Sequence, residues 1–286
     1  MRRRSRQRVF AISLLVFGLA VAGAVAQFRG GGGGRGFRRA PSGDEPLDRG
    51  NVPEWPVDKD FAKDVFTFAR IRYRSTWERQ SLAWYTDYPD ADLNLSFRLQ
   101  QFTSLKVDPN PKLLELTDPE LFDYPWVFMS GVGNIVMNDE EAAALRRYLL
   151  NGGFLMVDDF WGERQWASFY RAIRLAFPDR EPMDVPRTHP IFHCLFDIPN
   201  DRPLQTTNIM NARANPGVTW EGEDGKEVHY RALYDDKGRM MAFICHNTDT
   251  GDGWEEEGTD EWFFKEYSEN KCYPLGFNII FYAMTH

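Results

Sequence analysis

The stretch Gly152–Phe160 constrains the fold more than any other part of the sequence. It reads GGFLMVDDF: two glycines, four apolar residues, two adjacent aspartates and a phenylalanine. One helix pattern ends at the glycines and another begins after the aspartates. Short apolar runs between helices are typical of buried parallel strands, and such sheets bind ligands beyond the carboxyl ends of their strands. The sequence therefore predicts an α/β domain with Asp158 and Asp159 at the ligand-binding edge of its sheet.

Other segments fit around this strand. Residues 65–73 and 124–130 are rich in β-branched and aromatic residues and predict two further strands. Residues 90–103 and 163–177 carry apolar side chains three and four positions apart, which predicts helices. A short strand is also expected at 105–107.

The helix before Gly152 has the clearest predicted boundaries. Asn138 is suited to be its N-cap, and Glu141 three positions later would complete a capping box. Leu145 and Leu149 lie on its apolar stripe, and Gly152 suits a left-handed stop. These features predict a helix that packs on the sheet.

The last part of the chain predicts an irregular segment, a hairpin and a final helix. Residues 182–203 are rich in proline, 228–234 and 240–245 alternate as paired strands, and 276–284 has one apolar helical face. Alternating strands and helices predict a three-layer α/β sandwich, with a mostly parallel sheet and an antiparallel edge hairpin. One domain over residues 53–286 accounts for all of these elements.

The N-terminus has the pattern of a secretory signal peptide. Five arginines among residues 2–8 precede the apolar run 9–25, and Ala24-Val25-Ala26 fits a cleavage site, which predicts export to the periplasm. The alternative is an uncleaved segment 9–25 that anchors the chain in the inner membrane. Residues 27–52 are rich in Gly and Arg and predict a disordered linker.

Charge and cysteine content exclude several classes of function. Without residues 1–26 the chain keeps 29 basic and 42 acidic residues, a net charge of −13. Such an acidic domain is unsuited to binding nucleic acid or anionic lipid. Cys194, Cys245 and Cys272 form no CxxC motif, and their odd number leaves at least one thiol unpaired, so we expect free, buried thiols.

Several stretches together resemble the bacterial DUF4159 family, whose function is unknown. They are FARIRY (68–73), YPWVFMSG (124–131), GGFLMVDD (152–159), THPIF (188–192) and LGFNIIFYAMTH (275–286). This resemblance covers about residues 60–286. The family in turn resembles the class I glutamine amidotransferase-like superfamily, which implies a flavodoxin-like fold.

The resemblance allows one test of activity. In glutamine amidotransferases, the strand comparable to Phe154–Val157 leads into a turn that carries a nucleophilic cysteine. This sequence has Asp158-Asp159-Phe160 at that turn and no Gly-x-Cys-x-Gly motif. Cysteine-based amidotransfer is therefore not expected.

We expect a binding cleft at the carboxyl edge of the sheet. Its candidate residues are Arg70, Arg72, Tyr73, Ser130, Gly131, Asp158, Asp159, Trp161 and His189. The first hypothesis is an exported domain, non-catalytic or of unassigned activity, that binds an unidentified small molecule or protein. The alternative is a carboxylate- or metal-dependent hydrolase that uses Asp158 and Asp159 with His189. For the arginines and aspartates, salt bridges and helix caps are the structural alternative.

The sequence assigns no metal ligand and names no cofactor. Residues 247–257 (NTDTGDGWEEE) fail the spacing of a calcium loop and predict a solvated acidic loop. His189 and His193 have i, i+4 spacing, but Pro190 between them disfavours a helix that would present both. We also expect Arg70 or Arg72 to lie beside Asp158 or Asp159 and to lower the pKa of that carboxylate, which favours binding over acid catalysis.

Overall fold

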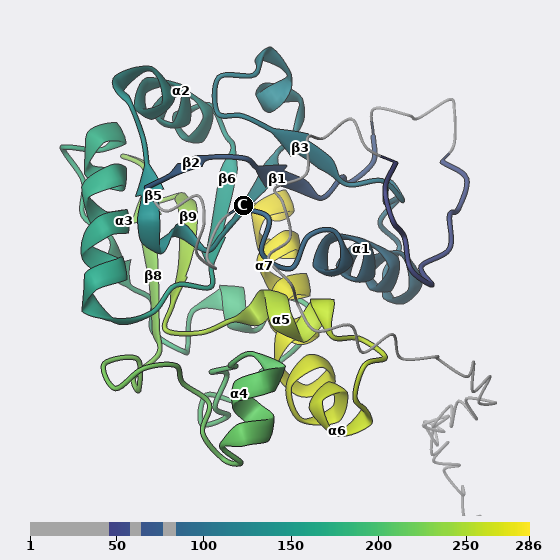
Figure 1. Cartoon of the computed structure of the whole chain (residues 1–286). Helices are drawn as coiled ribbons and strands as arrows, with labels where there is room; N and C mark the ends of the chain where they lie inside the picture. The colour runs from purple at the N-terminus through teal and green to yellow at the C-terminus, as the bar shows by residue number, and fades with distance from the viewer. Residues whose placement is uncertain (1–45, 58–63, 77–83) are drawn as a thin grey trace, which may run out of the picture. The chain divides into compact units, whose positions relative to one another are not determined.

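The computed structural model describes residues 46–57, 64–76 and 84–286 (Figure 1). Its main sheet has seven strands in the order β3-β1-β4-β6-β9-β8-β7. They are β1 (Ala69–Ile71), β3 (Lys112–Leu114), β4 (Trp126–Ser130), β6 (Phe154–Asp158), β7 (Met183–Asp184), β8 (His229–Tyr234) and β9 (Met240–His246). The short strands β2 (Arg74–Ser75) and β5 (Ile135–Val136) pair separately and antiparallel. The predicted signal segment and most of the predicted linker lie outside the described residues.

Five neighbouring strands, from β3 to β9, are parallel, and β8 and β7 continue the sheet as an antiparallel edge. The predicted mostly parallel sheet with an antiparallel hairpin is confirmed. The chain runs from β1 to β3 on one side and then crosses to β4 on the other side of β1. Ligands of open α/β sheets bind where the strand order reverses in this way, which here is the carboxyl end of β1 and β4.

Helices cover both faces of the sheet (Figure 1). The helices are α1 (Asp90–Phe102), α2 (Asp139–Leu150), α3 (Gly162–Ala176), α4 (Ile209–Ala214), α5 (Thr250–Glu255), α6 (Glu261–Phe263) and α7 (Tyr273–Thr285). A π-helical segment, Phe264–Cys272, joins α6 to α7, and 3₁₀ turns lie at Pro119–Asp123, Val132–Asn134 and Pro190–Phe192. The arrangement is the expected flavodoxin-like three-layer sandwich.

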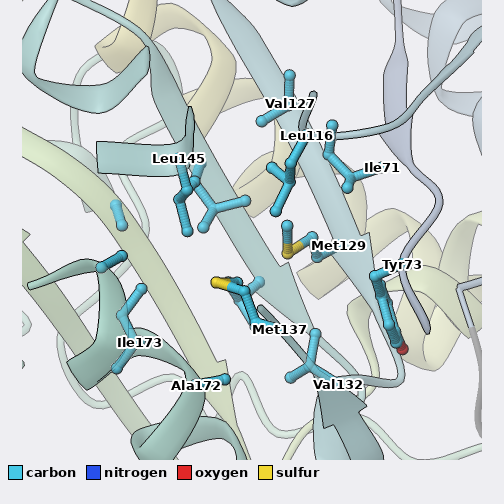
Figure 2. Close-up of a cluster of buried hydrophobic side chains, with 14 of the residues drawn as sticks. Ile71, Tyr73, Leu116, Val127, Met129, Val132, Met137, Leu145, Ala172 and Ile173 are labelled. Atoms are coloured by element: carbon cyan, nitrogen blue, oxygen red, sulfur yellow. The ribbon is translucent and has the colours of Figure 1, made fainter. Parts of the chain in front are cut away.

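One hydrophobic core lies between the sheet and helices α2 and α3. Figure 2 shows Leu145 of α2 and Ile173 of α3 in the same cluster as Ile71, Val127 and Met129 from the strands. All five side chains are at most 2 % exposed. The predicted stripe on the helix before Gly152 is thus the buried face of α2.

The second core lies on the opposite face and is strongly aromatic. Phe68, which precedes β1, packs edge-on against Trp126 and Phe128 of β4, and these two rings are stacked. The ring centroids are 5.0–6.0 Å apart. Trp254 of α5 joins them from the helical layer. Successive side chains of β4 point alternately into the two cores. The strand is therefore almost entirely apolar, as expected of a strand buried on both faces.

Most predicted boundaries agree with the structure. The capping box of α2 is present: Glu141 N donates to Asn138 Oδ1 over 2.8 Å, and Asn138 N donates to Glu141 Oε2 over 2.7 Å. Gly152 has φ 106°, which confirms the left-handed stop. All three cysteines are free, although Cys194 is exposed.

The strand expected at 105–107 is wrong. Of that segment only Val107 pairs with the sheet, in an isolated bridge with Phe66, and the regular strand β3 follows Pro111 instead. The prediction treated the prolines after Asp108 as the end of a strand. In the structure these prolines precede strand β3. Proline has no amide hydrogen to donate, so the hydrogen bonds of β3 begin at Lys112, whose N donates to Phe68 O.

Leu149 and Leu150 provide a matched test of the α2 face. Leu149 is fully buried and Leu150 is 41 % exposed. Leu149→Ala should lower the free energy of unfolding by roughly 2–5 kcal/mol, because it leaves a cavity under the sheet. Leu150→Ala should change it by less than about 1 kcal/mol. Urea denaturation of both variants measures this; equal losses would contradict the assigned face.

Candidate functional site

The carboxyl ends of β1, β4 and β6 meet at one edge of the sheet. The hydroxyl of Tyr73 donates to Ser130 O over 2.6 Å, and Gly131 N donates to Asp158 O over 3.1 Å. Gly131 has φ 67°, so the chain can turn sharply after β4. The predicted residues Tyr73, Ser130, Gly131 and Asp158 therefore lie together.

Asp158 is the last residue of β6 and Asp159 follows it, and both are almost completely buried. Asp158 Oδ2 accepts a hydrogen bond from Gly251 N over 2.8 Å, which connects β6 to α5. Asp159 Oδ1 accepts from the indole Nε1 of Trp161 over 3.1 Å. Neither aspartate caps α3, since Gly162 N donates to Asn247 Oδ1 and Glu163 N donates to Asp224 Oδ2.

Four more carboxylates gather beside this pair. Asp87 precedes α1, and Asp249, Asp252 and Glu255 belong to the α5 segment. Oxygen atoms of Asp87, Asp252 and Glu255 all lie within 4.8 Å of one another. We call the whole set, Asp87, Asp158, Asp159, Asp249, Asp252 and Glu255, the carboxylate cluster.

Burial makes negative charge costly in this cluster. It raises the pKa of Asp158 to about 7, although a hydrogen bond from Gly251 opposes the shift. The pKa of Asp87 is raised well above its ordinary value by burial, and then by the nearby Glu255 and Asp252. Burial also raises the pKa of Asp249, with Asp159 as the next contributor. Asp158 is therefore partly protonated near neutral pH, and burial disfavours the charged form of Asp87 and Asp249 as well.

Backbone strain is concentrated around the same site. Of the residues that the structure describes, three that are not glycine have positive φ: Asp87 (63°), Asp159 (55°) and Asn247 (62°). Asp87 and Asp159 are cluster members, and Asn247 precedes the α5 segment. Such conformations cost of order 1 kcal/mol each and tend to occur at functional sites.

The predicted arginines do not accompany the aspartates of β6. Arg70 is fully buried, and its Nε donates to Asp92 of α1 over 3.0 Å. Arg72 pairs with Glu115 at the surface over 2.8 Å. The expected lowered pKa is therefore wrong for Asp158, because burial dominates and raises it.

His189 is placed by other contacts. Its Nδ1 accepts from Ile191 N over 3.2 Å, and its ring lies 5.4 Å from the ring of Tyr282 in α7. The neighbouring histidine, His193, contacts Asp197 and Arg187 O. These contacts are structural, and the described contacts of His189 include no member of the carboxylate cluster.

The prediction of a solvated loop at 247–257 is wrong. Residues 247–254 are buried, and Thr250–Glu255 form α5, with Asp249 Oδ1 as acceptor for Asp252 N. The sequence does contain a signal: the acidic segment directly follows the apolar strand β9, whose carboxyl end is at the same edge as that of β6. Asp87 lacked any such signal.

Asp158→Asn should change how stability depends on pH. An aspartate with a pKa raised from 3.8 to about 7 in the folded state stabilises the fold at low pH and loses that contribution as pH rises towards 7. The free energy of unfolding of the variant, relative to wild type, should therefore rise between pH 4 and pH 8 by an amount on the order of a few kcal/mol.

Urea titrations across that pH range, in the presence of a chelator, measure this difference. Asp201→Asn, at an exposed position, is the control and should show little change. A difference between Asp158→Asn and wild type that does not vary with pH would contradict the raised pKa.

Comparison with known proteins places this architecture in a family. No curated protein matches the chain significantly. A family model described as "Domain of unknown function (DUF4159)" matches residues 67–284, which include all the main-sheet strands and every member of the carboxylate cluster. The chain belongs to the DUF4159 family.

Proposed function

We propose that this protein is an exported binding domain that holds a positively charged ligand at the carboxylate cluster and performs no cysteine chemistry. The observation that carries this proposal is the gathering of six acidic side chains, five of them buried, at the carboxyl edge of the sheet. Asp87 is the most telling member: it is 5 % exposed, and its Oδ2 has no hydrogen-bond partner.

Electrostatics determines the class of ligand. Removing a carboxylate from water costs several kcal/mol unless it is protonated or paired with a positive group. A cation that enters the cluster recovers this free energy and displaces the protons. An anionic ligand would add to the repulsion, so the cluster selects against it.

The position of the cluster supports binding. It lies at the carboxyl ends of β6 and β9, and Asp158 pairs with Ser130 at the end of β4, next to the reversal of strand order where α/β sheets hold their ligands. Glu255 is half-buried and the other members are buried, so the cluster reaches the surface at Glu255. A ligand can approach from that side.

The thiols support the absence of cysteine chemistry. Cys194 is an exposed residue, but partial burial of its thiol raises its pKa. Full burial raises the pKa of Cys272 to about 12. The pKa of Cys245 is raised well above its ordinary value for the same reason. A thiol that resists ionisation is a poor nucleophile at neutral pH.

The hydrolase alternative keeps one supporting observation. A pKa of about 7 would suit Asp158 as a general acid or base. The alternative also requires His189 near the aspartates, and the contacts of His189 with Ile191 and Tyr282 do not supply this.

A thermal-shift screen of the full-length chain tests the proposal. Divalent metal ions and organic cations such as polyamines should raise the melting temperature, whereas phosphate and citrate should not, because stabilisation reports binding to the folded state. Asp87→Asn should abolish the shift and Asp201→Asn should preserve it. Stabilisation by anions alone, or by no compound, would contradict the proposal; hydrolysis of an ester or amide that Asp158→Asn abolishes would favour the alternative.

Export is the second part of the proposal. It rests on the basic N-terminus, the apolar run and Ala24-Val25-Ala26. None of the helices in the described part of the chain combines the length and apolar character needed to span a bilayer.

N-terminal sequencing of protein from the native compartment should begin at Gln27. Ala24→Glu should block processing, because the cleavage site needs small residues. Protein that retains Met1 would show that the segment is not cleaved and would favour the membrane anchor.

A further inference from the structure

We propose that Asp87, Asp252 and Glu255 bind one hard divalent cation of the Mg²⁺, Ca²⁺ or Mn²⁺ class. This inference rests on the proposed function and names the ligand of the same cluster. The three residues come from two segments that the fold brings together, the turn before α1 and the helix α5.

The spacing of the three carboxylates fits a shared ion. One oxygen from each residue lies within 4.8 Å of one oxygen from each of the others. Oxygen ligands lie roughly 2.0–2.6 Å from Mg²⁺ or Ca²⁺, so two oxygens across one ion are separated by about 4–5 Å. Oxygens that lie no more than 4.8 Å apart are therefore close enough to contact one ion together.

Asp87 provides an independent indication. Its Oδ2 is buried and has no hydrogen-bond partner, which is rare for a carboxylate oxygen. A Cβ placed on Gly251 would lie 2.5 Å from this atom and 3.7 Å from Asp158 Oδ2. The absence of a side chain at Gly251 thus lets Asp87 and Asp158 approach the same small space.

The ligands are held in place before any ion binds. Arg70 donates to Trp84 O over 2.9 Å and to Thr86 O over 2.8 Å, which fixes the turn that ends in Asp87. Asp252 Oδ2 accepts from Ile209 N over 2.8 Å, and Asp252 N donates to Asp249 Oδ1 over 2.8 Å. Preorganised ligands reduce the entropy lost on binding.

The donor set selects among metals. All members of the carboxylate cluster are Asp or Glu, and carboxylate oxygens suit Mg²⁺, Ca²⁺ and Mn²⁺. Zn²⁺ and copper sites usually include histidine or cysteine. We therefore expect Mn²⁺, which substitutes for Mg²⁺ and Ca²⁺ at oxygen sites, to serve as a spectroscopic probe.

Titration of the full-length chain with Mn²⁺, followed by electron paramagnetic resonance, counts bound ions directly. Wild type should bind one ion per chain, and Mg²⁺ or Ca²⁺ should compete for it. Asp87→Asn and Glu255→Gln should each weaken binding more than about tenfold. The metal-free melting temperature of Asp87→Asn should be equal to or above that of wild type, because the amide removes the repulsion between Asp87 and its acidic neighbours. A purely structural role for Asp87 predicts the opposite.

Gly251→Ala provides a second variant that alters no ligand. It should also weaken Mn²⁺ binding, because the new methyl group displaces Asp87. If Asp87→Asn does not fold, Mn²⁺ binding by Gly251→Ala tests the site instead. Asp201→Asn should bind Mn²⁺ as wild type does. No Mn²⁺ binding by wild type, or unchanged binding by all three site variants, would overturn the inference. If polyamines stabilise the protein and metals do not, the proposed function stands and the metal site is wrong.

Discussion

The buried ion pair between Arg70 and Asp92 is the interaction on which the site depends most. It joins strand β1 to α1 in a region where both side chains are fully buried. The same guanidinium holds the carbonyls of Trp84 and Thr86 and lies 5.0 Å from the ring centroid of Phe128. Removing one partner of such a pair typically costs about 3–5 kcal/mol, because the other charge stays buried.

This pair also determines where the charge of Arg70 is used. Burial raises the pKa of Asp87, and the charge of Arg70 opposes that shift. The hydrogen bonds of Arg70, however, go to Asp92 and to backbone carbonyls. Asp87 is thereby positioned without being directly neutralised. The strained φ values of Asp87 and Asp159 show that the surrounding packing imposes this arrangement. A site that gathers acids in this way is suited to a cationic ligand.

Prediction from the sequence succeeded for features that depend on interactions between residues close together in the chain. The capping box of α2, its stop at Gly152 and the apolar strand Phe154–Asp158 each depend on residues a few positions apart. Tyr73, Ser130, Gly131 and Trp161 lie near Asp158 and Asp159, because the carboxyl ends of parallel strands share one edge. The prediction of a solvated loop at 247–257 is wrong because acidic residues that follow a buried strand can themselves be buried.

The sequence by itself determined the α/β class, the order of the main elements and the two aspartates at the end of β6. Tertiary structure alone decided which carboxylates meet, since Asp87, Asp158 and Asp252 are far apart along the chain and come together only through the pairing of β6 with β9 and the docking of α1 against α5. Tertiary structure also raises the pKa of Asp158, whereas a lowered pKa was expected from the sequence. A pKa depends on desolvation and neighbouring charge, and both are properties of packing that residue type and local spacing do not specify.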